Sequence, residues 1–170
     1  MKPPVYLALF ILILPLQSSM LGPLAIAGIS PDLVLIAVYV IGLLTGPREA
    51  AVAGLTLGFL QDINSAGFVG LMALTHGAAG FSAGLLGRNV LNFASPSNIL
   101  FLAAFSLGEA VLITLFIQVI FGSVPFFSML FTRMLPAAVY TGLFGTLVLQ
   151  LLKSRKTLVL LTRPSLQKEF

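Results

Sequence analysis

Apolar residues fill the chain in long runs, and short polar or glycine-rich breaks separate these runs. Runs of this kind are typical of helices that cross a bilayer, for which about 20 residues suffice. The breaks predict six helices, with expected bounds at about 5–21, 31–45, 50–65, 67–87, 96–122 and 126–152. The pattern therefore predicts an all-α integral membrane protein with six transmembrane helices. Its transmembrane domain would be 1–152, followed by a basic cytoplasmic tail at 153–170.

The first run, Val5 to Leu21, follows a single Lys2. A charged start before an apolar core is also the layout of a secretory signal peptide. No small-residue cleavage site follows cleanly and further apolar runs begin at once, so a retained helix is favoured. Pro15 and Gln17 suggest a kink in that helix, with its polar groups facing protein rather than lipid.

The second helix opens on Ser30, Pro31 and Asp32. Serine suits the N-cap, proline the first helical position and an acid the first turn, so the favoured role of Asp32 is that of a cap. The helix to Thr45 is roughly 24 Å long at 1.5 Å per residue, which is short for a hydrocarbon core of about 30 Å. We expect either the linker 22–30 to join it at an angle or the bilayer to be thinner there.

Small residues mark two helix faces. Gly54 and Gly58 are four residues apart in the third helix, and Asp62 continues that face one turn later. Gly80 and Gly84 form a second pair in the fourth helix. Glycine pairs let another backbone approach closely, so each face can be an internal seam or a seat for a partner helix. Asp62 at a helix end is costly unless a partner or water receives it.

Composition agrees with a membrane protein. Of the 170 residues, 58% are hydrophobic and only 8% are charged, and the mean hydropathy is +1.09. A soluble domain carries about 25% charged residues. The absence of cysteine excludes a disulfide framework and a thiolate metal site. The net charge of +4 is too sparse and scattered for a surface that binds nucleic acid.

The basic residues predict the orientation. With six spans, both termini and the turns after the second and fourth helices share one side of the membrane. That side receives Lys2, Arg48, Arg88, Lys153, Arg155, Lys156, Arg163 and Lys168. Because basic loops stay inside, we expect both ends in the cytoplasm. The cluster Lys153 to Lys156 would also favour anionic lipid headgroups.

Three ionisable residues fall near the predicted bilayer midplane: His76, Glu109 and Arg133. An unpaired charge there costs at least about 2.5 kcal/mol. We infer that Glu109 and Arg133 pair across the fifth and sixth helices, either as a brace that fixes helix register or as part of a ligand or proton site. His76 is expected to make an interhelical hydrogen bond.

Enzymatic chemistry finds little support. One histidine cannot build a histidine-based metal cluster, and Asp32, Asp62 and Glu109 lie on three different helices without the i, i+4 spacing of a helical metal motif. No Gly-x-Ser-x-Gly elbow occurs, and the glycines lie inside apolar spans where no phosphate cradle can form. We expect no enzyme, cofactor or metal.

Several short motifs resemble the rod shape-determining protein MreD family. They are Gly-Phe-Leu-Gln-Asp at 58–62 followed by Gly67 and Gly70, a glycine-rich fourth helix, and Ser-Pro-Asp-Leu at 30–33. Length, six spans and cytoplasmic ends agree. The positions that carry over from the family, and are candidates for a partner interface, are Pro31, Asp32, Gly58, Asp62 and Gly70; the glycine faces add Gly54, Gly80 and Gly84.

The resemblance implies a non-enzymatic scaffold of the bacterial cell-elongation machinery in the plasma membrane. Such a protein binds MreC, a single-span protein, and helps to couple the cytoplasmic MreB filament to peptidoglycan synthesis and rod shape. A glycosyltransferase of the RodA type and its transpeptidase partner would belong to the same assembly. Because lipid gives helices no hydrophobic drive to associate, close packing at small residues would hold these partners.

The alternative is a substrate-binding subunit of an energy-coupling-factor vitamin transporter, since MreD-like chains are similar to that fold in span count and form. Asp62, His76, Glu109 and Arg133 would then line a ligand pocket. Those subunits usually carry an Ala-x-x-x-Ala docking face in the first helix, whereas Ala8 stands alone here. The scaffold is therefore favoured.

Overall fold

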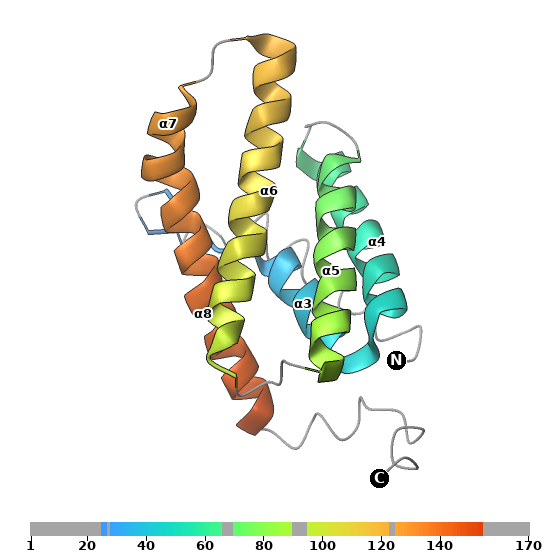
Figure 1. Ribbon diagram of the computed structural model, residues 1–170. Coiled ribbons are helices and arrows are strands. Elements are labelled where there is room, and N and C mark those ends of the chain that lie inside the picture. Colours follow the sequence, from blue (N-terminus) through green and yellow to red (C-terminus); the bar gives the residue numbers. More distant parts are fainter. Residues whose placement is uncertain (1–24, 27, 66–69, 90–94, 123–124, 155–170) are drawn as a thin grey trace.

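The computed structural model describes residues 25–26, 28–65, 70–89, 95–122 and 125–154 (Figure 1). Their helices are α3 (Leu33–Thr45), α4 (Pro47–Ser65), α5 (Leu71–Asn89), α6 (Ser97–Phe121), α7 (Phe126–Met129), the π-helix η1 (Leu130–Met134) and α8 (Leu135–Ser154). The all-α prediction is confirmed for this part of the chain. The predicted helix 5–21 lies outside the described residues, and so does the tail from residue 155.

Two predicted helix starts need correction. Ser30 is not the N-cap of α3; Asp32 is, and its Oδ1 accepts a hydrogen bond from the Leu35 backbone N–H at 2.9 Å. The predicted turn 46–49 is also shorter than expected. Gly46 ends α3 with a φ of +95°, and Pro47 already occupies the first position of α4. Proline fits there because the N–H that it lacks would have no helical partner.

The helices form two units, which Figure 1 shows side by side. One unit is α3 with the antiparallel hairpin of α4 and α5; the other is α6 paired with α8 and joined to it through α7 and η1. The upper end of α6 extends beyond the α4–α5 hairpin (Figure 1). Helices α5 and α6 contact each other only sparsely, so the units are held together mainly through α3 and its neighbours.

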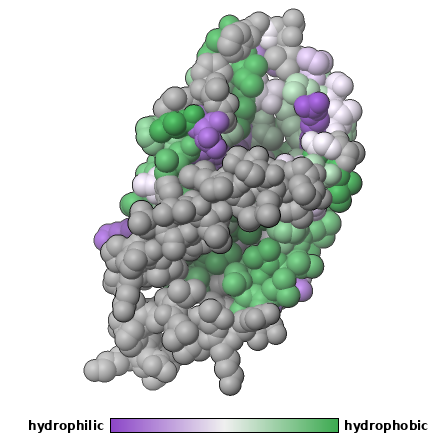
Figure 2. Space-filling model, turned by 180° about the vertical axis from the view of Figure 1, so that it is seen from behind, coloured by the Kyte–Doolittle hydropathy of each residue, from purple (hydrophilic) through white to green (hydrophobic). Residues whose placement is uncertain are grey.

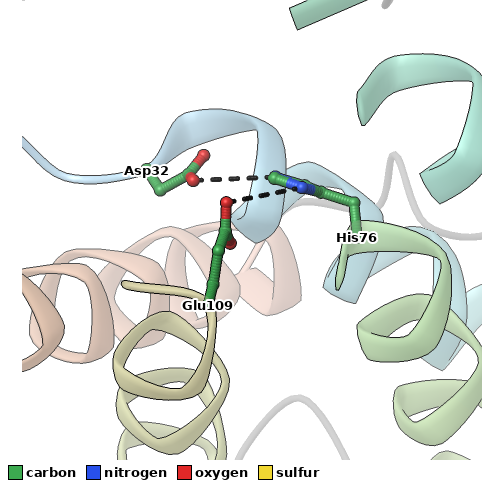
Figure 3. Close-up of side chains that lie close together, drawn as sticks. All are labelled: Asp32, His76 and Glu109. Atoms are coloured by element: carbon green, nitrogen blue, oxygen red, sulfur yellow. Dashed lines mark ion pairs between the residues drawn. The ribbon is translucent and has the colours of Figure 1, made fainter. Parts of the chain in front are cut away.

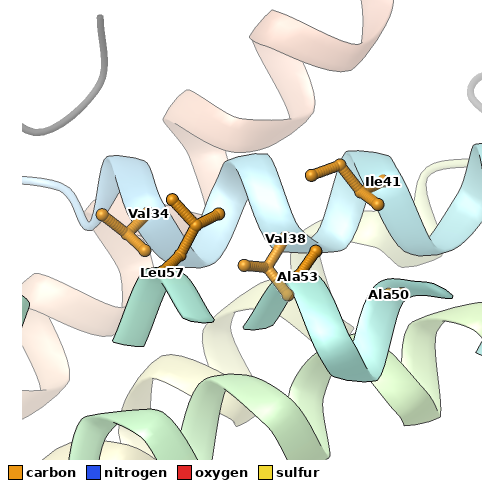
Figure 4. Packing of buried hydrophobic residues seen from close by; sticks show 6 residues of the cluster. All are labelled: Val34, Val38, Ile41, Ala50, Ala53 and Leu57. Carbon is orange, nitrogen blue, oxygen red and sulfur yellow. The ribbon is translucent and has the colours of Figure 1, made fainter. Parts of the chain in front are cut away.

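The short helix α3 is the centre of the apolar core. One cluster joins α3 to α4 and consists of Val34, Val38, Ile41, Ala50, Ala53 and Leu57 (Figure 4). A second cluster joins α3 to α5, α6 and α8 and consists of Ile36, Tyr39, Ala83, Leu102 and Leu149. The buried Tyr39 hydroxyl also donates to Asn98 Oδ1 at 3.0 Å, which ties α3 to the start of α6. Apolar packing on opposite sides of α3 thus links both units.

The glycine faces lie inside the bundle. A Cβ atom on Gly54 would collide with the backbone of His76, and one on Gly58 with the backbone of Met72. Both glycines therefore bring α4 against α5 more closely than any larger residue allows. Of the two roles that the sequence leaves open for this face, the close contacts favour the internal seam, since α5 of the same chain occupies it.

The second glycine pair has the same use. A Cβ atom on Gly80 would meet the Ala50 carbonyl oxygen, and one on Gly84 would meet the backbone at Pro47. These contacts pack α5 against the start of α4. Gly80 and Gly84 therefore form an internal seam and are not free to seat a partner.

Two helical stretches are long and apolar enough to cross a bilayer among the described residues: Ser97–Ile120 and Phe126–Leu152. Leu33–Thr45 and Leu71–Gly87 are shorter apolar helices. Where described residues are visible from behind, hydrophobic ones predominate in the lower half, and white to purple ones gather at the upper right (Figure 2). A mostly apolar exterior is what a lipid environment requires, because lipid offers no hydrogen bonds to polar groups.

The predicted sixth helix is not regular throughout. Leu130–Met134 adopts a π-helical turn just before Pro136. Proline has no N–H for the carbonyl four residues earlier, and its ring would clash with that carbonyl in an α-helix. Widening the turn removes this clash, so we attribute the π-helix to Pro136.

The internal seam predicts a large difference between two glycine substitutions. Gly58→Ala should lower the melting temperature, because its methyl group has to push α4 and α5 apart, at a cost of about 1–3 kcal/mol. Gly108→Ala in α6 is the matched control, since its Cβ would meet nothing within 4 Å. The control should be neutral or slightly stabilising. Melting in detergent followed by circular dichroism tests this, and equal melting temperatures for both variants would contradict the seam.

Candidate functional site

Asp62 lies at the C-terminal end of α4 and caps the next helix. Its Oδ2 accepts hydrogen bonds from the N–H groups of Gly70 at 2.8 Å and Ala73 at 3.1 Å, and its Oδ1 accepts from Met72 N–H at 3.0 Å. The first N–H groups of a helix have no intrahelical acceptor, and the helix dipole favours an anion there. The N–H groups at the start of α5 therefore stabilise the Asp62 carboxylate, whose burial at a helix end would otherwise be costly.

This cap explains two of the motif positions and corrects one expectation. Asp62 is only 2% exposed, so it is not a surface for a partner. Gly70 has a φ of +105°, a conformation that side chains with a Cβ rarely adopt. The motif from Gly58 to Gly70 thus builds the α4–α5 hairpin, although residues 66–69 of its turn are outside the described part of the chain.

Three helices bring Asp32, His76 and Glu109 together (Figure 3). Asp32 caps α3, His76 lies in the second turn of α5, and Glu109 lies at the middle of α6. His76 Nε2 is 3.6 Å from Asp32 Oδ2, and His76 Nδ1 is 3.7 Å from Glu109 Oε1. The side chains of His76, Glu109 and Asp32 are 0%, 8% and 20% exposed. We call these three residues the acid–histidine cluster.

The orientation of the His76 ring is fixed by its own helix. Nδ1 lies 2.8 Å from the Met72 carbonyl oxygen. A carbonyl can only accept a hydrogen bond, so Nδ1 carries a proton and donates it. Nε2 then faces Asp32 and is buried without a hydrogen-bond partner among the described residues. The close approach at Gly54 packs α4 against the backbone of His76 itself, which adds to this fixed position.

A polar pocket of about 220 Å³ opens beside the cluster. It lies between the start of α3, the middle of α6 and α8, and its lining residues are Ser30, Pro31, Asp32, Ser106, Glu109, Ala110, Ile113, Ala137 and Thr141. Thr141 Oγ1 accepts from the Asp32 N–H at 3.2 Å and from the Ser106 hydroxyl at 3.5 Å. Carboxylates with hydroxyl groups beside them suit a small cation or water molecules.

The structure changes the predicted ionic network. Glu109 lies beside His76, whereas Arg133 in η1 has an exposed side chain and is not part of the cluster. The inferred pair of Glu109 with Arg133 is therefore wrong. Helix length predicts how deep a residue lies but not which way it points around the helix, and the π-helical turn shifts that direction further for Arg133.

The sequence-based prediction placed His76 and Glu109 at a similar depth but gave Asp32 only the role of a helix cap. The available signal was the short length of α3, which brings its N-terminal cap into the interior instead of the membrane surface. Pro31, also among the motif positions, is fully buried in the wall of the pocket. Asp32 therefore acts as a cap, as expected, and also as a partner of His76.

An apolar groove of about 490 Å³ separates the two units on another face. It lies between α5 and α6 and is lined by Leu71, Leu74, Thr75, Ala78, Leu112, Leu115, Phe116 and Val119. Sparse contact between α5 and α6 leaves this groove open. Its lining suits an apolar helix or a lipid chain.

Comparison with protein families gives a match over most of the chain. The family model of the rod shape-determining protein MreD matches residues 3–155, which is most of the chain. No curated protein and no solved structure matches.

The Asp62 cap predicts a graded loss of stability. Asp62→Leu removes all three acceptor contacts to the start of α5 and should cost about 2 kcal/mol or more, because buried N–H groups lose their partners. Asp62→Asn keeps one acceptor oxygen and should lose less. Asn64→Leu, at an exposed position near the same end of α4, serves as the control. Thermal melting measured by circular dichroism checks the order, and an Asp62→Leu variant as stable as the control would refute the cap.

A double-mutant cycle tests the acid–histidine cluster. We expect His76→Gln and Glu109→Gln to be coupled by about 0.5–3 kcal/mol in unfolding free energy, as residues in contact are. Arg133→Gln and Glu109→Gln should instead add to within about 0.5 kcal/mol. Denaturant titrations in one detergent give all the values. Coupling of Glu109 to Arg133 but not to His76 would reverse this assignment.

Proposed function

We propose that this chain, which belongs to the rod shape-determining protein MreD family, is a non-enzymatic membrane scaffold of the bacterial cell-elongation machinery. The observation that carries the proposal is the family match over residues 3–155, and membership implies a role in rod shape determination. The two long apolar helices fit a membrane-associated family. The finer points below, on topology and partners, are our proposals.

The proposed topology has six spans with both ends in the cytoplasm of the plasma membrane. Helices α3, α4, α5, α6 and the continuous α7–η1–α8 would supply five spans, and the apolar run 5–21 the first. Arg48 then lies on the cytoplasmic side, close to the α3–α4 turn. This is the side that the positive-inside rule favours. The fold would resemble the substrate-binding component of energy-coupling-factor transporters. The basic tail at 153–170 would contact anionic lipid headgroups.

The proposed partners are MreC and, with it, a RodA-type glycosyltransferase and its transpeptidase. Through MreC the scaffold would couple the cytoplasmic MreB filament to peptidoglycan synthesis. The turns at 66–70 and 122–125 are too short to form a domain outside the membrane. Partners would therefore be held mainly by helix faces within the bilayer.

The apolar groove between α5 and α6 is the surface that we assign to the single span of MreC. The glycine faces are already used inside the bundle, whereas the groove is concave and its lining is exposed. Leu74 and Val119, for example, are 69% and 84% exposed. In lipid, helix association depends on van der Waals contact, and a concave surface offers a guest helix more contact than a convex one.

The vitamin-transporter alternative has weaker support. Pockets for drug-sized ligands measure about 300–1,000 Å³, whereas the polar pocket at Asp32 and Glu109 has about 220 Å³. Asp62 serves as a helix cap and Arg133 is exposed, so neither lines that pocket. These features favour the scaffold.

Cysteine crosslinking tests the assigned groove, and the chain suits it because it contains no cysteine. We expect Leu115→Cys in the groove to crosslink to cysteines placed along the MreC span, with a period of three to four residues. Leu147→Cys on α8 is the matched control, since both leucines are about half exposed, at 46% and 53%. Crosslinks from the control position alone would move the interface to α8. If MreC does not co-purify with the unmodified protein, MreC is not its partner.

A further inference from the structure

We propose that Asp32, His76 and Glu109 bind one divalent cation, with Zn²⁺ as the ion that this ligand set fits best. Each residue offers one ligand atom, and these three atoms lie within 4.8 Å of one another. The residues come from three helices, α3, α5 and α6, so the site is formed only by the folded bundle (Figure 3).

The donor atoms select the class of metal. Zn²⁺ is bound in proteins by imidazole nitrogens and carboxylate oxygens, and its open sites combine three protein ligands with water in the fourth position. Mg²⁺ and Ca²⁺ prefer oxygen ligands alone. The polar pocket beside the cluster, with the hydroxyl groups of Ser106 and Thr141, has room for the water ligand.

His76 is prepared for such a role by its hydrogen bond to the Met72 carbonyl. That bond holds the proton on Nδ1 and leaves the lone pair of Nε2 directed at Asp32. Metal-binding histidines usually donate their second ring N–H to a carbonyl or carboxylate in this way. Nε2 is buried in a fully buried ring and has no hydrogen-bond partner among the described residues. A lone pair that faces a carboxylate is repelled unless a cation or a proton lies between them.

Charge balance favours a dication. Two carboxylates lie in a largely buried site, where an uncompensated charge is costly. With both carboxylates ionised, a proton on His76 leaves the three residues with a net charge of −1, whereas a divalent ion with neutral imidazole brings it to zero. The ion would also join Glu109 of α6 to Asp32 and His76 of the other unit, across the region where α5 and α6 contact each other sparsely.

The distances require only a small adjustment. Three atoms within 4.8 Å of one another have a common point at most about 2.8 Å from each. Bonds from Zn²⁺ to nitrogen and oxygen are about 2.0–2.2 Å long. Asp32 Oδ2 already faces Nε2 at 3.6 Å, whereas the Glu109 carboxylate, whose Oε1 is 3.7 Å from Nδ1, has to turn toward Nε2 by side-chain rotation to reach the ion.

The experiment uses full-length protein carrying an affinity tag without histidine, purified in detergent and treated with chelator. Because His76 is the only histidine of the chain, any imidazole bound to zinc belongs to this site. Titration with ZnCl₂ should raise the melting temperature saturably, by about 4 °C or more well above the dissociation constant. X-ray absorption at the zinc edge should show one imidazole ligand. Mg²⁺ should give no comparable shift.

Variants separate binding from folding. His76→Gln and Glu109→Gln should each weaken zinc binding at least tenfold, while Glu49→Gln, outside the cluster, should bind zinc like the unmodified protein. If a cluster variant does not fold, zinc binding to the unmodified protein still tests the proposal. Absence of saturable zinc binding to it, or a zinc site without imidazole, would overturn the proposal and leave a proton-linked ion pair in its place. Neither result depends on MreC, so the scaffold role is tested separately.

Discussion

A bilayer core contains no water for a buried polar group, and this constraint explains where the acids of the chain lie. Asp62 directs its carboxylate at the N–H groups of Gly70, just before α5, and of Met72 and Ala73 in its first turn, which have no helical acceptor. Asp32 likewise caps α3 and lies beside His76, which in turn lies beside Glu109. Asp32, Asp62 and Glu109 therefore each have a partner within the chain, and these contacts join α4 to α5 and α5 to α3 and α6.

The same constraint gives α3 its special position. Its N-terminal cap lies in the interior, where it contributes to the acid–histidine cluster, and its apolar faces pack against both helical units. The glycines of α4 and α5 then close one unit tightly, whereas α5 and α6 remain apart and leave the apolar groove. Among the described residues, this groove leaves an apolar surface that suits another helix, while the glycine contacts close the seam between α4 and α5.

Much of this arrangement could be predicted from the sequence, because helix bounds depend on local patterns. The breaks near Pro31, Pro47 and Gly122 place the ends of α3, α4 and α6 within a few residues. Glycine spacing predicted close helix contacts, and depth placed His76 near Glu109. The identity of each neighbour was not predictable, because residue spacing says nothing about how helices are rotated against one another. For that reason Arg133 was paired wrongly, Asp32 was not linked to His76, and the glycine faces were left open between an internal seam and a seat for a partner.

We propose that the buried ionic groups of this chain act inside the bundle and that the groove between α5 and α6 receives a partner helix. A cryo-EM structure of the protein with MreC in a lipid nanodisc tests it most directly. We predict density for one foreign helix along the groove lined by Leu74 and Leu115, with Asp62 still on the start of α5. A foreign helix packed between α4 and α5 at Gly58, or a vitamin enclosed among Asp32, His76 and Glu109, would contradict the account.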